Sequence, residues 1–365
     1  MKRRIAIVTG GGDCPGLNTV IRAVVKAASR RGWDSIGILD GFEGLLDPVQ
    51  VRDLEYRQMD GLLYRGGTIL GTRNRGRFSA KTGHGDIRRV PDNVIWEANK
   101  NFQQLGLDAL VCIGGDGTLT IAQQLYEIGM PVVGIPKTID NDLDATIMTF
   151  GFESAVTCAV DALDRLHTTA ESHDRVMVLE VMGRYAGWIA GFAGIAGGAD
   201  VILIPEIPFN YDAIVEKIQE REKEGKQFTI VIVAEGAREH DSDFTTFAKV
   251  GTDREARLGG IGHLVADEIQ KRTGKETRAV VLGHLQRGGS PTAWDRQLCT
   301  RFGVLAVELI ADDNFGKMVA WTPEGIAPVE IIDAIDKIRT VPVDGDIVRV
   351  GRALGVSFGE RWLNT

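Results

Sequence analysis

The sequence has no apolar run of the length that a membrane helix needs. Its longest uncharged stretch, residues 185–199, is rich in Gly and Ala and falls short of the ~20 residues that span a bilayer. The apolar run near the N-terminus extends only from Ile5 to Val8, which is too short for a secretory signal. Cysteine is scarce, with 4 residues far apart and no CxxC pair, so a disulfide framework is not indicated. We therefore expect a soluble cytoplasmic protein with no membrane partner.

Charge of one sign is not concentrated anywhere. Lys plus Arg total 42 against 50 Asp plus Glu, a formal net charge of −8, and no acidic tail or basic block occurs. A basic surface for general nucleic-acid binding is therefore not expected. Proline is low at 11 residues, and no Pro/Ser linker marks a domain border. At about 100 to 200 residues per domain, the 365 residues suggest two domains or one large α/β unit.

Glycine is in excess, with 45 of 365 residues, or about 12% against a usual ~7%. Short β-branched runs alternate with helical periodicity, the pattern of βαβ units that form a mostly parallel sheet. Strands are predicted at 5–9, 35–39, 109–113, 131–135, 176–181, 201–204, 229–234 and 279–282. Helices are predicted from near Gly16 and over 118–129, 152–166, 184–196, 211–224, 257–272 and 293–311. Residues 235–256 are predicted to form an irregular surface segment.

Two glycine clusters lie where a predicted strand turns into a predicted helix, the edge of an α/β sheet at which ligands bind. The first is Gly10-Gly11-Gly12-Asp13, and the second is Gly114-Gly115-Asp116-Gly117-Thr118. Glycine lets backbone N–H groups approach an anion, and the helix N-terminus adds partial positive charge. The first cluster can equally be a tight turn, and Asp116 or Thr118 can equally cap the next helix. The first is neither a Walker A loop nor a GxGxxG fingerprint, so P-loop ATPases and Rossmann dehydrogenases lose support.

About twenty residues further on, another predicted strand ends in Lys137-Thr138-Ile139-Asp140-Asn141-Asp142. Two carboxylates at i and i+2, beside a Lys and a Thr, provide a candidate general base, Asp140. Asp142 can hold that base in place or reach a metal. A lone acidic turn is the ordinary interpretation of such a motif, but here it would coincide with a Gly/Asp loop at the same sheet edge.

With these motifs the sequence resembles the bacterial-type 6-phosphofructokinase family over most of the chain. GGDGT alone also resembles sites in NAD kinases and diacylglycerol kinases, which lack the later motifs. The motifs in order are Gly-Gly-Asp at 11–13, Gly66-Gly67-Thr68-x-Leu70-Gly71, GGDGT at 114–118, PKTIDND at 136–142, Met182-Gly183-Arg184, Glu235 ending a strand, Glu276-Thr277-Arg278 and Gly283-His284-Leu285-Gln286-Arg287-Gly288-Gly289-Ser290-Pro291.

The resemblance implies an α/β fold of two Rossmann-like, three-layer α/β/α lobes with mostly parallel sheets and the active site in the cleft between them. Residues 1–151 plus 285–325 would form the nucleotide lobe, and residues 152–284 plus 326–365 the sugar-phosphate lobe. The implied reaction is a step of glycolysis. It transfers the γ-phosphoryl group of ATP to the 1-hydroxyl of fructose 6-phosphate.

The resemblance also implies roles for individual residues. Asp140 would take the hydroxyl proton, Thr138 would hold the transferred phosphoryl group, and Arg184 would offset its charge. Asp116 would bind Mg²⁺. The residues implied at the sugar phosphate are Thr138, Ile139, Asp140, Arg175, Met182, Gly183, Arg184, Glu235, Arg278, His284, Leu285, Gln286 and Arg287. In the family, the residues matching Arg175 and Arg278 come from a neighbouring subunit, so a homodimer or homotetramer is expected.

On the nucleotide side, the resemblance implies Gly12, Gly115, Asp116, Gly117 and Thr118 at the phosphates. The family's next element is a glycine turn that ends in an arginine, and the sequence here is Gly71-Thr72-Arg73-Asn74-Arg75. The family's arginine falls opposite Asn74, so either Arg73 or Arg75 takes its role.

Two positions bear on the phosphoryl donor, because some family members use pyrophosphate in place of ATP. Pyrophosphate users usually carry Asp where this chain has Gly117, and a carboxylate there would repel the α-phosphate of ATP. Lys137, however, matches the pyrophosphate users. We favour ATP, with pyrophosphate as the alternative, and a different sugar phosphate as acceptor remains open. A non-catalytic sugar-phosphate sensor on the same fold would be expected to have lost Asp140, Asp116 or Arg184, and all three are present.

Overall fold

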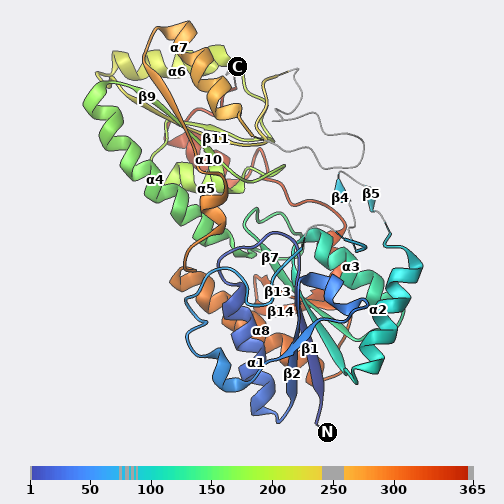
Figure 1. The fold of residues 1–365 in the computed structure, drawn as a ribbon. Helices are drawn as coiled ribbons and strands as arrows, with labels where there is room; N and C mark the ends of the chain where they lie inside the picture. Colours follow the sequence, from blue (N-terminus) through green and yellow to red (C-terminus); the bar gives the residue numbers. More distant parts are fainter. Residues whose placement is uncertain are drawn as a thin grey trace. The chain divides into compact units, whose positions relative to one another are not determined.

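The structure is a computed structural model that describes residues 2–73, 76–78, 82–83, 86–87, 89–240 and 259–360. The chain divides into two compact units (Figure 1). Unit 1 contains the chain up to Ile139, Leu143–Ser154 and Arg287–Ile338. Unit 2 contains Asp140–Asp142, Ala155–Gln286 and the chain from Arg339 onward.

Unit 1 is built around a sheet of eight strands in the order β14-β13-β7-β6-β1-β2-β3, with β8 paired to β7. Its elements are β1 (Arg4–Thr9), α1 (Leu17–Arg30), β2 (Asp34–Ile38), η1 (Gly41–Leu45), β3 (Val51–Asp53), η2 (Tyr56–Met59), β4 (Thr82–Gly83), β5 (Asp86–Ile87), α2 (Asp92–Gln104), β6 (Ala109–Gly114), α3 (Asp116–Glu127), β7 (Val132–Thr138), β8 (Phe150–Gly151), α8 (Ala293–Ala311), β13 (Lys317–Thr322), β14 (Gly325–Glu330) and α9 (Ile331–Ile335). Strands β2, β1, β6, β7 and β13 run parallel, whereas β3 and β14 pair antiparallel at the two edges.

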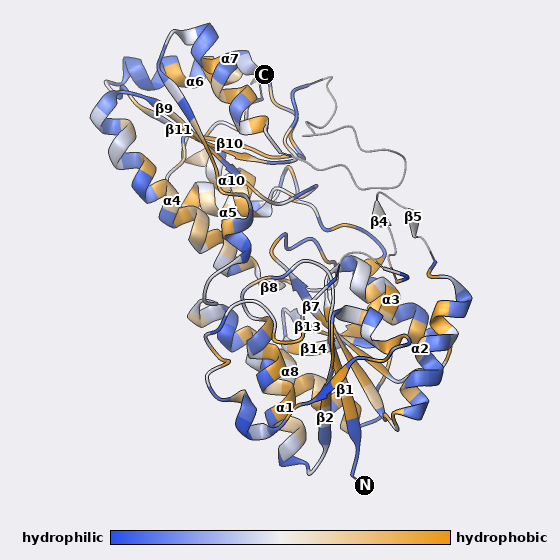
Figure 2. Ribbon diagram, viewed as in Figure 1, coloured by the Kyte–Doolittle hydropathy of each residue, from blue (hydrophilic) through white to orange (hydrophobic). Residues whose placement is uncertain are grey.

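Helices cover both faces of this sheet (Figure 1). In β1, Ala6 and Val8 pack in one core with the apolar faces of α2, α3 and α9. Because successive strand residues point to opposite faces, Ile5 and Ile7 face α1 and α8 on the other side. The apolar strands and the polar outer faces of the helices are visible in Figure 2. Unit 1 is therefore a three-layer α/β/α unit.

The pairing of α1 with α8 depends on small residues. The apolar stripe of α1, including Val20 and Val24, is fully buried. On α8, a Cβ on Gly303 would lie 2.6 Å from the Cβ of Ala23 and 3.1 Å from the carbonyl oxygen of Val20. Glycine at position 303 thus lets the two helix backbones approach closely.

Unit 2 has a four-stranded, all-parallel sheet in the order β10-β11-β9-β12. Its elements are α4 (Phe152–His173), which begins in unit 1, β9 (Val176–Val181), α5 (Trp188–Ala196), β10 (Val201–Leu203), α6 (Tyr211–Lys223), β11 (Thr229–Ala234), α7 (Ile261–Thr273), β12 (Thr277–Val281), η3 (Gly283–Arg287), which ends in unit 1, and α10 (Asp346–Ala353). On one face, Val176 and Val231 pack with Ile214 of α6 and Val265 of α7. Helix α5 covers the other face, so this unit is also α/β.

Several elements differ from those predicted. Helix α2 and strands β3, β13 and β14 were not predicted. The edge strands β3 and β14 pair antiparallel and lack the apolar run of a buried parallel strand. Residues 326–338 were assigned to the second lobe, but β14 pairs with β13 and α9 packs on α3, both in unit 1. Helix α5 begins at Trp188 rather than 184. Helix α7 begins at Ile261, and residues 257–258 of its predicted span lie outside the described residues. Most of the predicted surface segment, residues 241–256, lies outside the described residues.

Candidate active site

In unit 1, three adjacent parallel strands, β1, β6 and β7, end at the same edge of the sheet. The loop after β1 is tied to β6 by the hydrogen bond from Gly10 N–H to the carbonyl of Ile113, 3.0 Å. Gly11 has a φ of +76°, a left-handed conformation that favours glycine. A Cβ on Gly12 would lie 2.8 Å from Nη1 of Arg287, so the bare backbone lets this guanidinium approach. The loop is therefore built for close approach of charged groups to its main chain.

Lys137, near the end of β7, places a second cation at this loop. Its Nζ donates to the carbonyl of Gly12 at 2.7 Å and lies 3.4 Å from the position of a Cβ on Gly11. The side chain is only 4% exposed. Arg287 Nη1 donates to the carbonyl of Asp13 at 3.2 Å. A buried ammonium and a guanidinium beside a glycine loop form a site suited to phosphate oxygens.

The second glycine cluster forms the start of α3. Gly115 is the N-cap, and Asp116, Gly117 and Thr118 form the first turn, so the N-terminal end of the helix, with its first-turn N–H groups, lies at this sheet edge. The Thr118 Oγ1 lies 2.3 Å from the position of a Cβ on Gly114 and 2.5 Å from that on Gly10. The ends of β1 and β6 must be glycine to make room for Thr118, which brings the two clusters together.

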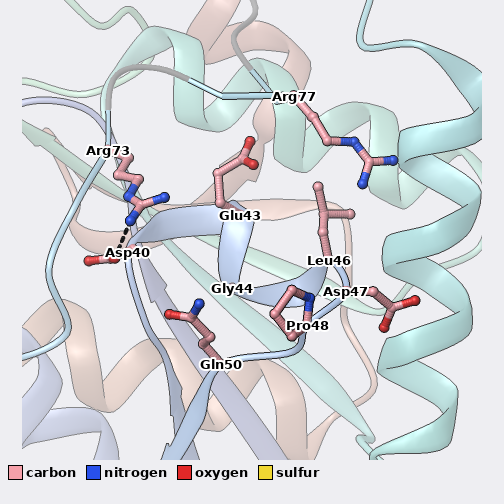
Figure 3. Close-up of a pocket in the computed structure, with 9 residues that line it drawn as sticks. All are labelled: Asp40, Glu43, Gly44, Leu46, Asp47, Pro48, Gln50, Arg73 and Arg77. Atoms are coloured by element: carbon pink, nitrogen blue, oxygen red, sulfur yellow. Dashed lines mark ion pairs between the residues drawn. The ribbon is translucent and has the colours of Figure 1, made fainter.

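A small pocket lies on the same side of unit 1, beyond the end of β2 (Figure 3). It has a volume of about 150 Å³ and is lined by Asp40, Glu43, Gly44, Leu46, Asp47, Pro48, Gln50, Arg73 and Arg77. Arg73 Nη2 pairs with Asp40 Oδ2 at 2.9 Å. Thr72 Oγ1 donates to the carbonyl of Gly11 at 2.5 Å, which ties this segment to the first glycine loop. Asn74 and Arg75 lie outside the described residues.

The pocket was not predicted from sequence. Asp40 and Gly41 follow strand β2 at the edge where the glycine loops also lie, and this position is the signal that could have indicated it.

In unit 2, Met182, Glu235 and His284 follow the carboxyl ends of β9, β11 and β12. The backbone N–H of Arg184 donates to Glu235 Oε1 at 3.1 Å, so these two residues are brought together. Burial, together with the neighbouring charge of Asp140, raises the pKa of Glu235 to about 7. A carboxyl group that titrates near neutral pH beside a second acid is typical of a functional site.

The predicted helix over 184–196 would place Arg184 at a helix start, but the structure does not. Arg184 lies in the turn before α5, with a left-handed φ of +48° and an exposed side chain. A Cβ on Gly236 would lie 1.8 Å from the Arg184 carbonyl oxygen, so this turn packs directly on the residue after Glu235. The Arg184 backbone is thus fixed while its guanidinium remains accessible.

Sequence analysis missed Glu180, a buried carboxylate in β9. Its two oxygens accept from the backbone N–H groups of Gly260, at 3.0 Å, and Gly262, at 2.8 Å, at the start of α7. Its backbone carbonyl accepts from Leu282 N–H at 3.1 Å. Glu180 therefore positions the segment that leads to His284. No local pattern marks it, because its partners are some 80 positions away.

The implied sugar-phosphate residues differ in how they are presented. The side chains of Ile139 and Gln286 are fully buried, so only their backbones could meet a ligand, whereas His284 and Leu285 are exposed. Thr138 is buried, and its carbonyl accepts from Thr149 Oγ1 at 2.7 Å.

Arg175 and Arg278 lie at the opposite edge of the unit 2 sheet from Met182 and Glu235. Arg175 precedes β9 and Arg278 is the second residue of β12, and both strands run parallel. Both guanidinium groups pair with Glu276 Oε1, at 2.8 and 2.6 Å. A strand of five or six residues is roughly 17–20 Å long, so within one protomer the two arginines are distant from Glu235.

Among the residues that the structure describes, no group of three or more His, Cys, Asp or Glu side chains could hold a metal ion. Asp116, in the first turn of α3, is a single carboxylate beside the glycine loops. One carboxylate together with phosphate oxygens and water is the usual coordination of Mg²⁺ at a nucleotide, so Asp116 fits that role.

Within the described residues, no helix combines the length and apolarity needed to cross a bilayer.

The ATP-dependent 6-phosphofructokinase of Chloroflexus aurantiacus is 52% identical over 98% of this chain and 98% of its own length. A pyrophosphate–fructose 6-phosphate 1-phosphotransferase of Amycolatopsis mediterranei is 49% identical over 93% of this chain and 97% of its own length.

A solved structure and a family model agree with these relatives. The crystal structure of Pichia pastoris phosphofructokinase in the T-state has a TM-score of 0.80 and 32% identity, covering 92% of this chain and 36% of that longer chain. The sequence model of the family described as phosphofructokinase matches residues 4–310. The chain therefore belongs to the phosphofructokinase family.

Proposed function

We propose that the protein is an ATP-dependent 6-phosphofructokinase, a glycolytic phosphotransferase of the cytoplasm. It transfers the γ-phosphoryl group of ATP to the 1-hydroxyl of fructose 6-phosphate. The observation that carries the proposal is the strand end Lys137–Asp140. Lys137 lies at the glycine loops of unit 1, Asp140 lies beside Glu235 in unit 2, and only two residues separate them in the chain. A cation on the proposed phosphoryl-donor side and the candidate base thus lie on one short stretch of chain.

In the proposed reaction, Asp140 accepts the proton of the 1-hydroxyl group. The hydroxyl oxygen forms a bond to the γ-phosphorus, the bond to the β–γ bridging oxygen breaks, and ADP leaves with that electron pair. Arg184 and Thr138 stabilise the charge on the transferring group, which is the main aid available in phosphoryl transfer. Glu235 accepts from hydroxyl groups of the sugar, and Met182 and Gly183 line its ring. His284 and Arg287 bind its 6-phosphate, with the backbones of Ile139 and Gln286 and the exposed Leu285 adjoining.

On the donor side, Gly12, Gly115, Gly117 and Thr118 would meet the nucleotide phosphates. Asp116 would hold Mg²⁺, which neutralises charge on the phosphate oxygens when it is bound. Arg73 lines the pocket beyond β2 and is held by Asp40, which supports a nucleotide contact from this segment. Asn74 adjoins it in the chain.

Arg175 and Arg278 are proposed to bind the 6-phosphate in a neighbouring subunit's site. Their position at the opposite sheet edge from Glu235 supports this, because neither can reach the site of its own protomer. The active form would then be a homodimer or homotetramer. Light scattering of the purified protein measures its mass, and an active monomer would contradict this part of the proposal.

Pyrophosphate is the second candidate donor, favoured by Lys137 and by the relative named for that donor. Glycine at 117 supports ATP, since it leaves room beside the α-phosphate.

The function is tested by measuring kcat/KM with fructose 6-phosphate and either MgATP or magnesium pyrophosphate, and by varying the sugar phosphate with the preferred donor. We expect the highest value for ATP with fructose 6-phosphate. A preference for pyrophosphate would overturn the donor, and absence of transfer from both donors would overturn the enzyme.

A further inference from the structure

In unit 2, the backbone of Arg339 is hydrogen-bonded to two separate parts of the candidate site. Its N–H donates to the carbonyl of Asp142 at 2.8 Å, two residues beyond Asp140. Its carbonyl accepts from the indole Nε1–H of Trp188 at 2.9 Å. Trp188 is the first residue of α5 and follows the turn that carries Arg184. One residue thus connects the segment of the proposed base with the segment of the proposed charge-stabilising arginine.

The side chain of Arg339 makes the same connection a second time. Its guanidinium carbon lies 4.3 Å from the centroid of the Trp188 ring, the geometry of a cation–π contact. Its Nη1 donates to the carbonyl of Asn141 at 3.4 Å, a long hydrogen bond. Trp188 is almost fully buried and Arg339 is half-buried, so this stacked pair is shielded in part from water, which strengthens it.

Glu206 links the same two segments a second time, through Val341, two residues beyond Arg339. The carboxylate of Glu206 accepts from Gly187 N–H at 2.9 and 3.1 Å, and from Val341 N–H at 2.8 Å. Residues 339–341 are therefore fastened to residues 187–188 at both ends. We call residues 339–341 the strap.

The strap acts on backbone that needs external support. Asn141 has a φ of +53° and Arg184 a φ of +48°, left-handed conformations that cost energy for residues other than glycine. Such conformations persist only where surrounding contacts hold them. Asn141 is held from its carbonyl by Arg339, and the turn of Arg184 is held from its C-terminal side by Trp188 and Glu206.

We propose that Arg339 and Trp188 are positioning residues for phosphoryl transfer, which hold the segment of Asp140 in place relative to the turn of Arg184. This inference rests on the proposed roles of Asp140 and Arg184. Arg339 does not touch the substrate; it acts through Asn141, Asp142 and Trp188. Displacing a catalytic group by about 1 Å can cost roughly 100-fold in rate, so a loosened strap lowers kcat while the donor site of unit 1 remains intact.

The test compares Arg339→Ala, Arg339→Lys and Trp188→Phe in the full-length enzyme, with Arg349→Ala as the matched control. Arg349 is an exposed arginine in the same C-terminal segment and pairs with Asp346, three residues away in the chain. We expect R339A to lower kcat about 10- to 100-fold, with KM for ATP and the melting temperature nearly unchanged. R339K keeps the charge, so its kcat should lie between those of R339A and the wild type. W188F keeps an aromatic ring but loses the indole N–H, so its kcat should fall less than that of R339A. Millimolar methylguanidinium should restore part of the R339A activity, and R349A should behave like the wild type.

A double-mutant cycle with Asp140→Asn separates positioning from a structural role. If Arg339 acts through Asp140, R339A lowers kcat much less in the D140N background than in the wild type. If R339A lowers kcat by the same factor in both backgrounds, or if R339A alone has wild-type kcat, the inference is overturned. If R339A does not fold, the same cycle with R339K or W188F decides it. Wild-type activity of D140N alone would instead refute the proposed base and leave the strap contacts unexplained.

Discussion

The two units present opposite chemistry at the carboxyl edges of their sheets. In unit 1 the edge has glycine loops, a helix N-terminus and two cations, Lys137 and Arg287. In unit 2 the edge has the acids Asp140, Glu180 and Glu235, and burial, followed by the charges of the other two acids, raises the pKa of Glu235. The first arrangement suits a polyphosphate, and the second suits hydroxyl groups and proton transfer. A kinase needs both, and here each is supplied by one unit.

The largest effect is expected from removing the proposed general base of unit 2. Asp140→Asn keeps the shape of the side chain but cannot accept the hydroxyl proton, so kcat should fall about 10²- to 10⁴-fold. ATP binding, measured by calorimetry, should change little because its proposed site lies in unit 1. The control is Asp144→Asn, four residues on, whose carboxylate pairs with Lys337 at 3.2 Å. If D140N and D144N have similar kcat, the contrast between the units is wrong.

Next in size is a structural effect confined to unit 1. Asp295 in α8 is fully buried, and it accepts from Gly151 N–H and Ser154 N–H at 2.9 Å and from Ser154 Oγ at 2.6 Å. It thereby joins α8 to the β8–α4 junction. Asp295→Ala leaves these donors unpaired, so we expect a loss of about 2–4 kcal/mol in the free energy of unfolding. Urea denaturation measures it, and the exposed Asp313→Ala is the control.

How far the sequence predicts this structure differs between the units. The glycine loops of unit 1 are local: strand, glycine and helix follow one another within about ten residues, so the sequence indicates directly that Gly10–Gly12 and Gly115–Thr118 lie between a strand and a helix. Spacing does not indicate that Lys137 bonds to Gly12, because the two are 125 positions apart. In unit 2, Glu180, Trp188 and Arg339 work through distant backbone partners, and no periodicity marks such pairs. The edge strand β14 was missed for a related reason, since it lacks the continuous apolar pattern of central parallel strands.

A moderate effect should follow from removing the buried cation of unit 1. Lys137→Met deletes the ammonium at the Gly12 loop while keeping an apolar stem of similar length. Hydrogen bonds to charged groups contribute about 1.5–3 kcal/mol, so kcat/KM for the phosphoryl donor should fall roughly 10- to 100-fold. KM for fructose 6-phosphate should change less, and the exposed Lys337→Met should leave both constants near wild type. An equal rise in KM for both substrates would show that Lys137 does not serve the donor side alone.

The smallest effect is a pH dependence that belongs to unit 2. Burial and the charge of Asp140 raise the pKa of Glu235 from 4.5 to about 7. Its contribution to stability is therefore fully present below pH ~4.5 and is lost as the pH rises through ~7. Binding runs the other way, because the ionised carboxylate is the stronger acceptor for sugar hydroxyls. We expect kcat/KM for fructose 6-phosphate to rise a few-fold between pH 6 and 8. The substrate's own phosphate also titrates near pH ~6, so the decisive comparison is with Glu235→Gln, which has the same substrate but no carboxyl group. If the rise in kcat/KM is the same in E235Q as in the wild type, it comes from the substrate or from another group, and Glu235 does not titrate in this range.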